Sequence, residues 1–151
     1  MTLDPIDIKI LVLLQEDGRR SYSEIASEIG RTEVTIRRRV RRLINEGIIT
    51  RFTVVLDPLK IGRSISAIVR VKAQMKKATA IADTVKEYEE VTEAYFLDGA
   101  CGVMLKVTVD SLSKLKDFLE NRLGRVDGVG EVETCIVLET VKSSQVAMLR
   151  E

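Results

Sequence analysis

The amino-acid sequence predicts an α+β fold in two parts: an N-terminal helix-turn-helix domain joined by a strand to a C-terminal ferredoxin-like βαββαβ domain. Two observations predict it. Up to Gly47 the apolar residues recur with the helical period of about 3.6, and after it the period shortens to about two, as in strands. Strand and helix patterns then alternate in the order βαββαβ. We assign residues 1–50 to the helix-turn-helix domain, 51–63 to a connecting strand and linker, and 64–151 to the ferredoxin-like domain.

Two capped helices open the chain. Asp4 before Pro5 is typical of an N-cap with proline at the first helical position, and Gly18 marks the end of this helix. The segment Ser21–Glu24 has capping-box spacing, so a short second helix begins there and stops at Gly30. A short helix and a tight glycine turn, followed by another helix, are the parts of a helix-turn-helix motif.

The third helix carries the most informative pattern in the chain, a run of five closely spaced arginines. Thr32 is a suitable N-cap for this helix. Its apolar residues are spaced for one buried stripe, formed by Ile36, Val40, Leu43 and Ile44. Because like charges at neighbouring helical positions repel, such a run indicates contact with a polyanion. The basic residues are Arg37, Arg38, Arg39, Arg41 and Arg42.

The remainder of the chain predicts a connecting strand and then a sheet. The segment 48–56 is rich in β-branched residues and precedes Asp57-Pro58, so we expect the connecting strand there. In the sheet that follows, both helices should cover one face. Because the other face would expose apolar side chains, we expect a second copy to pack on it and form a homodimer. The predicted strands are 65–73, 91–97, 103–109 and 131–141, and the helices are at about 79–88 and from Asp110.

The composition excludes several classes of function. The chain has 151 residues, of which 45% are apolar and 31% charged. It contains no histidine, which removes Ser-His-Asp and Cys-His nucleophilic sites and the usual zinc ligand sets, and its two cysteines form no CxxC motif. We therefore expect no catalytic residue, metal or cofactor. Since no apolar stretch has the length of a membrane span and no secretory signal is visible, we expect a cytoplasmic protein without membrane contact.

Positive charge gathers at the third helix although the net charge of the chain is only +1. Residues 1–51 hold ten Lys and Arg against eight Asp and Glu, a balance of +2, whereas the remainder holds 14 against 15, a balance of −1. A solvated basic helix is the simpler interpretation of such a run. The preceding capped helix and two-residue turn favour double-stranded DNA as the partner, because fold and charge then agree.

The second helix of a helix-turn-helix motif places its N-terminal half in the major groove, so we expect base contacts there. Arginine grips guanine O6 and N7, and threonine or valine meets the methyl group of thymine. Arginines on the flanks and in the turn would hold phosphates and set the register. The base-reading candidates are Glu33, Val34, Thr35 and Arg38, and the phosphate candidates are Arg31, Arg37, Arg41 and Arg42, with Arg19 and Arg20 as weaker ones.

Six segments carry a resemblance that covers nearly the whole chain. They are Leu3–Leu11, Ile25–Gly30, Val34–Val40, Glu46–Ile49, Val55–Pro58 and Thr134–Lys142. Each is weak alone, but in their order and spacing they resemble the Lrp/AsnC family, the leucine-responsive and asparagine-responsive (feast-famine) transcription regulators. This resemblance implies a prokaryotic regulator whose C-terminal domain dimerises and assembles further to tetramers or octamers.

The same resemblance implies that the domain 64–151 senses a small amino acid at the interface between dimers. The family uses the turn after the second strand of this domain and part of the last strand. Members commonly have an aspartate where this chain has Gly102, and Asp98 is a nearby carboxylate that could instead meet an effector's ammonium group. The effector residues carried over by position are Gly99, Ala100, Cys101, Gly102, Thr134 and Cys135, with Asp98 as the substitute carboxylate.

Several interpretations stay open at this point. The leading one is a sequence-specific regulator that binds a pseudo-palindrome as a dimer, and the alternative is an architectural protein that wraps DNA without sequence preference. An enzyme or a detached regulatory subunit would need clustered acid-base or metal-binding residues, which the sequence lacks. At the effector positions, the glycines also suit an ordinary turn and the cysteines also suit apolar packing.

Overall fold

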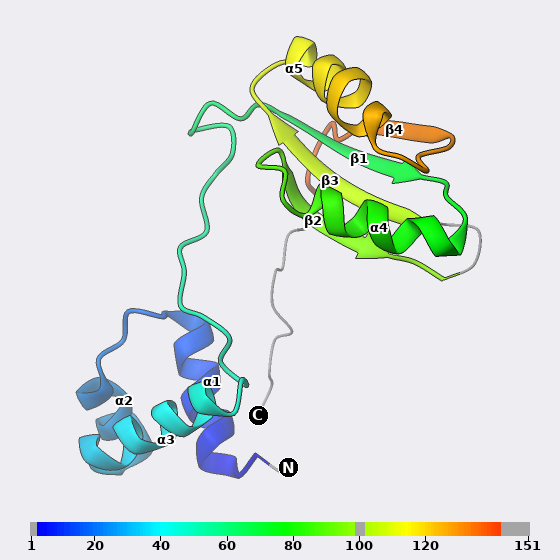
Figure 1. Cartoon of the computed structure of the whole chain (residues 1–151). Coiled ribbons are helices and arrows are strands. Elements are labelled where there is room, and N and C mark those ends of the chain that lie inside the picture. Colours follow the sequence, from blue (N-terminus) through cyan, green and yellow to red (C-terminus); the bar gives the residue numbers. More distant parts are fainter. Residues whose placement is uncertain (1–2, 99–101, 143–151) are drawn as a thin grey trace. The chain divides into compact units, whose positions relative to one another are not determined.

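The structure of the chain, a computed structural model, describes residues 3–98 and 102–142 (Figure 1). The chain divides into two compact units, and the boundary between Val54 and Val55 falls inside the predicted linker. The first unit is helical, and the second contains a four-stranded sheet with its helices. The predicted α+β fold is therefore confirmed.

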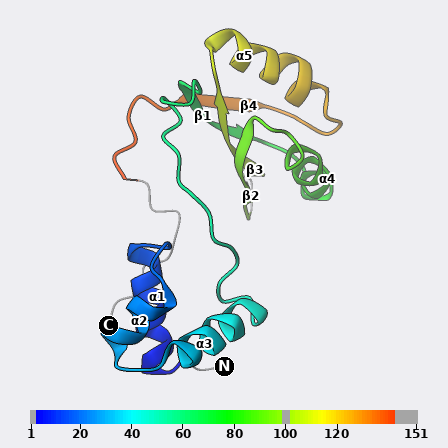
Figure 2. The ribbon, with the colours of Figure 1, turned by 90° about the vertical axis from the view of Figure 1, so that its left-hand side faces the viewer.

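The first unit contains three helices that begin at the predicted caps (Figure 2). The Asp7 N–H donates to Asp4 Oδ1 at 2.8 Å, and the Glu24 N–H donates to Ser21 Oγ at 3.2 Å, so both aspartate and serine caps are formed. Gly30 ends the second helix with a φ of 71°, a left-handed conformation that favours glycine. The helices are α1 (Pro5–Glu16), α2 (Tyr22–Ile29) and α3 (Glu33–Asn45).

A small apolar core holds α3 against α1 and α2. The predicted stripe is buried except for Ile44, which is 44% exposed. Around the helix axis, Ile36 and Leu43 lie on one side of Val40, and Ile44 lies on the other side. The core contacts Val40 and the side with Ile36 and Leu43, which leaves Ile44 partly exposed. The apolar residues of this core that are exposed by no more than 1% are Ile10, Ile25, Ile36, Val40 and Leu43.

The predicted connecting strand does not form. Residues 51–57 pair with no strand in the described part of the chain. β-branched composition favours a strand, but a strand also needs a neighbour to satisfy its N–H and C=O groups. The four strands of the sheet all lie after Ser64 and pair only among themselves. The apolar side chains of this segment are consequently 51–76% exposed: Phe52, Val54, Val55 and Leu56.

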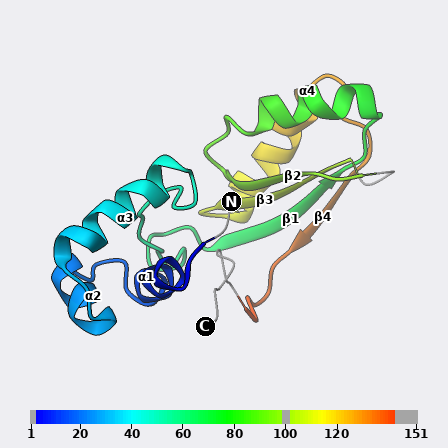
Figure 3. The same cartoon turned by 90° about the horizontal axis from the view of Figure 1, so that it is seen from below.

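The second unit has the predicted βαββαβ order, with antiparallel strands arranged β2-β3-β1-β4. Both helices lie on one face of the sheet (Figure 3). The last helix continues as a π-helical turn, Phe118–Arg122, and a 3-10 turn, Leu123–Arg125. The main elements are β1 (Ile65–Val71), α4 (Met75–Val85), β2 (Val91–Phe96), β3 (Val103–Val109), α5 (Leu112–Asp117) and β4 (Val132–Ile136).

Two elements of this unit have boundaries that differ from the prediction. α4 begins at Met75 rather than near residue 79, because Gln74 has the extended backbone of an N-cap and good helix formers follow it. β4 ends at Ile136 rather than at residue 141. The Val137 N–H still donates to the Ser66 carbonyl at 2.8 Å. Because β1 begins at Ile65, it has no residue to pair with the last residues of the predicted strand.

The sheet face opposite the helices carries ion pairs, so it is less apolar than expected, and the packing of a second copy on it stays a prediction. Lys106 Nζ lies 3.0 Å from Glu93 Oε1, and Arg70 pairs with Glu133 across β1 and β4. Hydrogen bonds from Tyr95 and from Lys106 lower the pKa of Glu93. These residues alternate with the buried apolar positions of their strands, so the period of two places charge on the outer face.

The ranges 3–98 and 102–142 contain no helix that combines the length and the apolar character needed to cross a membrane. Nor do His, Cys, Asp or Glu side chains of these described ranges gather in threes in a way that could hold a metal ion.

Candidate nucleic-acid interface

The first turn of α3 is fixed by its cap and exposed to solvent. The Thr35 N–H donates to Thr32 Oγ1 at 3.3 Å, and the two hydroxyl oxygens lie 2.8 Å apart. The Thr35 hydroxyl is thus engaged within the turn, whereas Glu33 and Val34 are exposed, Val34 by 76%. An exposed apolar side chain at this place suits contact with a thymine methyl group.

Three arginines of this region are available to an anionic partner. Arg38 and Arg41 are exposed on α3, and neither makes an ion pair with a described residue. Arg31, in the turn before α3, donates from Nη1 to the Gly30 carbonyl at 3.0 Å and likewise has no carboxylate partner among residues 3–98 and 102–142. Their charges are therefore not neutralised within the described parts of the chain.

Arg37 is partly neutralised by its own helix. Its Nη2 lies 2.6 Å from Glu33 Oε1, and its guanidinium carbon lies 5.4 Å from the centre of the Tyr22 ring. Because Arg37 and Glu33 are both about half exposed, this pair contributes little to stability. Binding a phosphate would therefore cost little in lost contacts.

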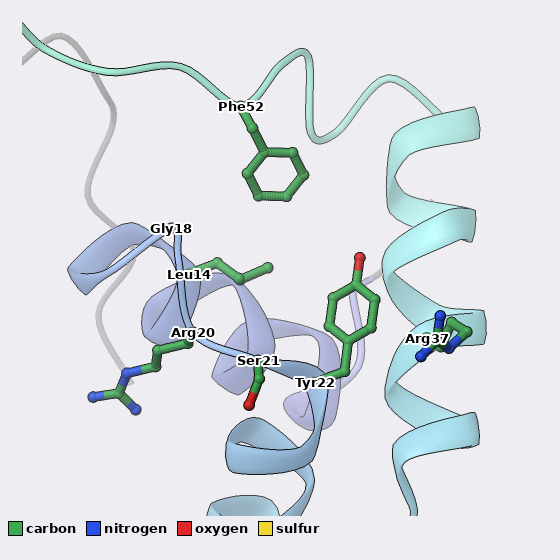
Figure 4. A pocket seen from close by; sticks show the side chains of 7 residues that line it. All are labelled: Leu14, Gly18, Arg20, Ser21, Tyr22, Arg37 and Phe52. Carbon is green, nitrogen blue, oxygen red and sulfur yellow. The ribbon is translucent and has the colours of Figure 1, made fainter.

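Arg37 also lines an open pocket of about 380 Å³ in the helical unit (Figure 4). Phe52, which follows α3, covers one side of this pocket, and its ring lies above Leu14. The lining residues are Leu14, Gly18, Arg20, Ser21, Tyr22, Arg37 and Phe52.

The two weaker candidates differ in their surroundings. Arg20 Nη1 lies 2.6 Å from Glu28 Oε2, and its Nη2 lies 3.3 Å from Glu16 Oε2, so Arg20 links the ends of α1 and α2. Arg19 is 94% exposed and only approaches Asp17, at 3.5 Å. Arg20 therefore serves the fold, whereas Arg19 is accessible.

Arg39 and Arg42 face α1. Arg39 Nη1 lies 2.6 Å from Asp4 Oδ2 and 2.8 Å from Asp7 Oδ1, and Arg42 Nη2 pairs with Asp7 Oδ2. The hydrogen bonds that Arg39 donates to Asp4 and, to a smaller extent, to Asp7 raise the pKa of Arg39, and the bond to Asp4 is the main cause of the lowered pKa of Asp4. Arg42 Nε also lies 3.9 Å from Glu46 Oε2. This division of the arginines was not predicted, although the aspartates at the N-cap and in the first turn of a neighbouring helix were a visible signal.

At the effector region, Gly102 is buried with a φ of 66°. A Cβ added to it would lie 2.2 Å from the Val71 carbonyl oxygen and 3.1 Å from the Ala73 nitrogen. This backbone therefore leaves no room for the aspartate that the family commonly has at this position. The other turn positions of the predicted set, Gly99, Ala100 and Cys101, lie outside the described residues.

The remaining effector candidates do not come together within one chain. On β4, Thr134 lies opposite Val69 on the helix-covered face, and Cys135 lies opposite Ile68 on the other face. Asp98 follows β2, at the far edge of the sheet, with β3 and β1 between it and β4. Three strand spacings amount to roughly 14 Å, more than a small amino acid spans. Asp98 and β4 of a single chain therefore cannot both contact one small amino acid.

Two models of protein families match the chain. The AsnC-type helix-turn-helix domain matches residues 3–44, the range that contains the three helices of the first unit up to Ile44. The Lrp/AsnC ligand binding domain matches residues 66–147, which include nearly all of the sheet and both of its helices.

Similar proteins are transcription regulators. An uncharacterised HTH-type transcriptional regulator of Pyrococcus furiosus is 40% identical over 140 residues, 93% of this chain and 95% of that protein. The regulator LrpA of Pyrococcus horikoshii is 34% identical over 140 residues, 93% of this chain and 99% of that protein.

Solved structures with the same fold cover nearly the whole chain. E. coli AsnC aligns with a TM-score of 0.89 and 27% identity over 97% of this chain and 99% of that chain. A transcriptional regulator from Neisseria meningitidis in complex with L-Met aligns with a TM-score of 0.88 and 27% identity over 95% of each chain.

Proposed function

The chain belongs to the Lrp/AsnC family, whose members are transcription regulators and not enzymes, and from this premise we propose that it binds specific DNA sequences through α3. The observation that carries the proposal is the outward face of α3, where Val34 and Arg38 are exposed and Arg38 has no carboxylate partner among the described residues. The same helix is anchored from behind by the buried Ile36, Val40 and Leu43. A rigid helix with such a face is suited to the major groove.

We propose that the first half of α3 reads base edges. Arg38 has the geometry to bind guanine O6 and N7 with two hydrogen bonds, and Val34 can meet a thymine methyl group. Thr35 contributes its methyl group, because its hydroxyl is held by the cap at Thr32. Glu33 can accept a hydrogen bond from cytosine N4, although it must then share its carboxylate with Arg37.

We propose that the phosphate backbone is held by Arg31, Arg37 and Arg41. Arg42 belonged to the same expected set, but its guanidinium meets Asp7 and Glu46, which reduces what it offers to DNA. With three phosphates per chain, a dimer engages six. The logarithm of the binding constant should then fall with the logarithm of salt concentration at a slope of roughly −5.

We propose that the chain acts as a homodimer or a higher assembly. The support is the exposed apolar segment from Phe52 to Leu56, which has no strand partner in the described part of the chain, so that a second copy offers it a place to be buried. A two-fold dimer would bind pseudo-palindromic sites with half-sites about one helical turn apart.

We propose that a small amino acid binds between copies of the C-terminal domain. The support is the match of residues 66–147 to a ligand binding domain and the L-Met complex of the similar regulator from Neisseria meningitidis. Because Gly102 accepts no carboxylate side chain, an effector's ammonium group would have to meet Asp98 or a backbone carbonyl. Such an effector shifts assembly only by its difference in affinity for the two states.

Selection of binding sites from a random duplex pool tests the proposed function. The purified protein is used at about 150 mM salt to suppress binding driven by counterion release, with and without a mixture of free amino acids. Enrichment of a palindrome supports a sequence-specific regulator, and a shift of that palindrome with amino acids supports the effector. Equal retention of all sequences would contradict base reading and favour an architectural protein that wraps DNA.

A further inference from the structure

Two aspartates of α1 divide the arginine run of α3. We propose that Asp7, assisted by Asp4, is a specificity-determining positioning residue that withholds Arg39 and Arg42 from DNA. DNA recognition then depends on the outward-facing residues of α3, and sequence-independent binding to DNA is weakened. This inference rests on the proposed DNA-binding function, which names α3 as the reading helix.

The geometry around Asp7 supports this role. Its side chain is 1% exposed, and its two oxygens meet two different guanidinium groups: Oδ1 lies 2.8 Å from Arg39 Nη1, and Oδ2 pairs with Arg42 Nη2. Asp4 Oδ2 adds a second carboxylate to Arg39 at 2.6 Å. A buried carboxylate that lost these partners would be left as an uncompensated charge, so the folded protein retains them.

The aspartates are themselves fixed by the backbone of α1. The Asp7 N–H donates to Asp4 Oδ1 at 2.8 Å, and the Asp4 N–H donates to Asp7 Oδ2 at 3.3 Å. The capping box that starts α1 is therefore also the group that binds α3. The bonds from Arg39 and Arg42 to Asp7 join α3 to α1 through residues more than thirty positions apart in the sequence. They therefore help to set the rotation of α3 about its axis, which determines that Arg38 points outward.

The two arginines differ in what release would do. Arg42 is 47% exposed, so without Asp7 its guanidinium can turn toward a phosphate, whereas Arg39 is 18% exposed and more enclosed. Sequence-independent binding grows with the number of phosphates neutralised, and base contacts do not. Withholding these cations therefore raises the ratio of specific to non-specific binding without changing a base contact.

The test compares Asp7→Asn with Asp17→Asn in the full chain. Both changes remove one negative charge from α1 or its end, but Asp17 pairs with Arg19 and not with α3. Binding to a selected duplex and to a random duplex is titrated over a series of salt concentrations, and thermal melting verifies folding.

For Asp7→Asn we expect the salt slope to become steeper by about one per chain for each released arginine. We also expect tighter binding of the random duplex and a several-fold lower ratio of the affinity for the selected duplex to that for the random duplex. Asp17→Asn should keep the wild-type slope and ratio. A folded Asp7→Asn protein with wild-type slope and wild-type ratio would overturn the inference.

Arg42→Gln gives a second test that does not depend on the folding of Asp7→Asn. Introduced alone, it should leave the salt slope unchanged, whereas Arg41→Gln should make it shallower by about one per chain. Combined with Asp7→Asn, it should remove most of the steepening. Equal loss of slope in Arg42→Gln and Arg41→Gln would mean that Arg42 already holds a phosphate, which contradicts the inference. Failure of the wild-type protein to distinguish the two duplexes would instead contradict the proposed function.

Discussion

Gly102 and Val71 approach so closely that a Cβ on the glycine would lie 2.2 Å from the valine carbonyl oxygen. Gly102 also has a φ of 66°, which costs an L-residue about 1–3 kcal/mol even where space is free. We therefore expect Gly102→Ala and Gly102→Asp to destabilise the second unit by more than this strain alone, as measured by urea unfolding. Gly62→Ala is the matched control, because Gly62 has a φ of 79° but no atom within 4 Å of the added Cβ. Equal losses at the two positions would contradict the steric argument.

Arg38 and Arg41 should respond differently to removal, because we propose that Arg38 contacts bases and Arg41 contacts phosphates. Arg38→Ala should relax the base preference and weaken binding of a selected duplex by about 1–3 kcal/mol. Arg41→Ala should weaken selected and random duplexes alike and make the salt slope shallower by about one per chain. Titrations of both duplexes over a range of salt concentrations measure the two effects. Identical behaviour of the two variants across sequences would refute the division into base and phosphate contacts.

Thr32 caps the helix that carries the proposed interface, so its hydroxyl should matter for stability. Thr32→Ala removes the acceptor of the Thr35 N–H and should lower the free energy of unfolding of the helical unit by about 1 kcal/mol. Ser27→Ala, on an exposed position of α2, is the control and should be nearly neutral. Urea unfolding followed by circular dichroism measures both, and a neutral Thr32→Ala would show that the cap contributes nothing.

Asp4 should make stability depend on acidity. Its pKa in the folded chain lies below the ordinary 3.8, chiefly because it accepts a hydrogen bond from Arg39. A lowered folded pKa means that the stabilisation is fully present above the unfolded pKa, near 4, and is lost as pH falls through the folded value. Asp4→Asn should therefore weaken the decline of stability below about pH 4, measured by urea unfolding at a series of pH values. An unchanged acid dependence in the variant would show that Asp4 does not contribute to it.

Local signals in the sequence were sufficient for most of the fold. The caps at Asp4, Ser21 and Thr32 involve partners within three residues, so spacing alone reveals them. The change of period after Gly47 likewise revealed the βαββαβ order. The connecting strand was wrong because β-branched composition says nothing about whether a partner strand is present, and residues 51–57 have none in the described part of the chain.

The candidate interface was less predictable than the fold. A charge run does not reveal which of its members meet carboxylates from another helix, and the pairing of Arg39 and Arg42 with Asp7 depends on how α1 packs on α3. The restriction at Gly102 was also hidden, because the obstructing atom belongs to Val71, on a different strand. Both features arise from contacts between residues far apart in the sequence.

The separation of Asp98 from β4 by two intervening strands has a consequence for regulation. A ligand bound by both would be held by two chains, so its occupancy would rise with the concentration of the protein as well as with that of the ligand. The ligand-bound fraction of the regulator would then depend on two concentrations, that of the metabolite and that of the protein itself. A cell that makes more of this protein would answer to lower levels of the same metabolite.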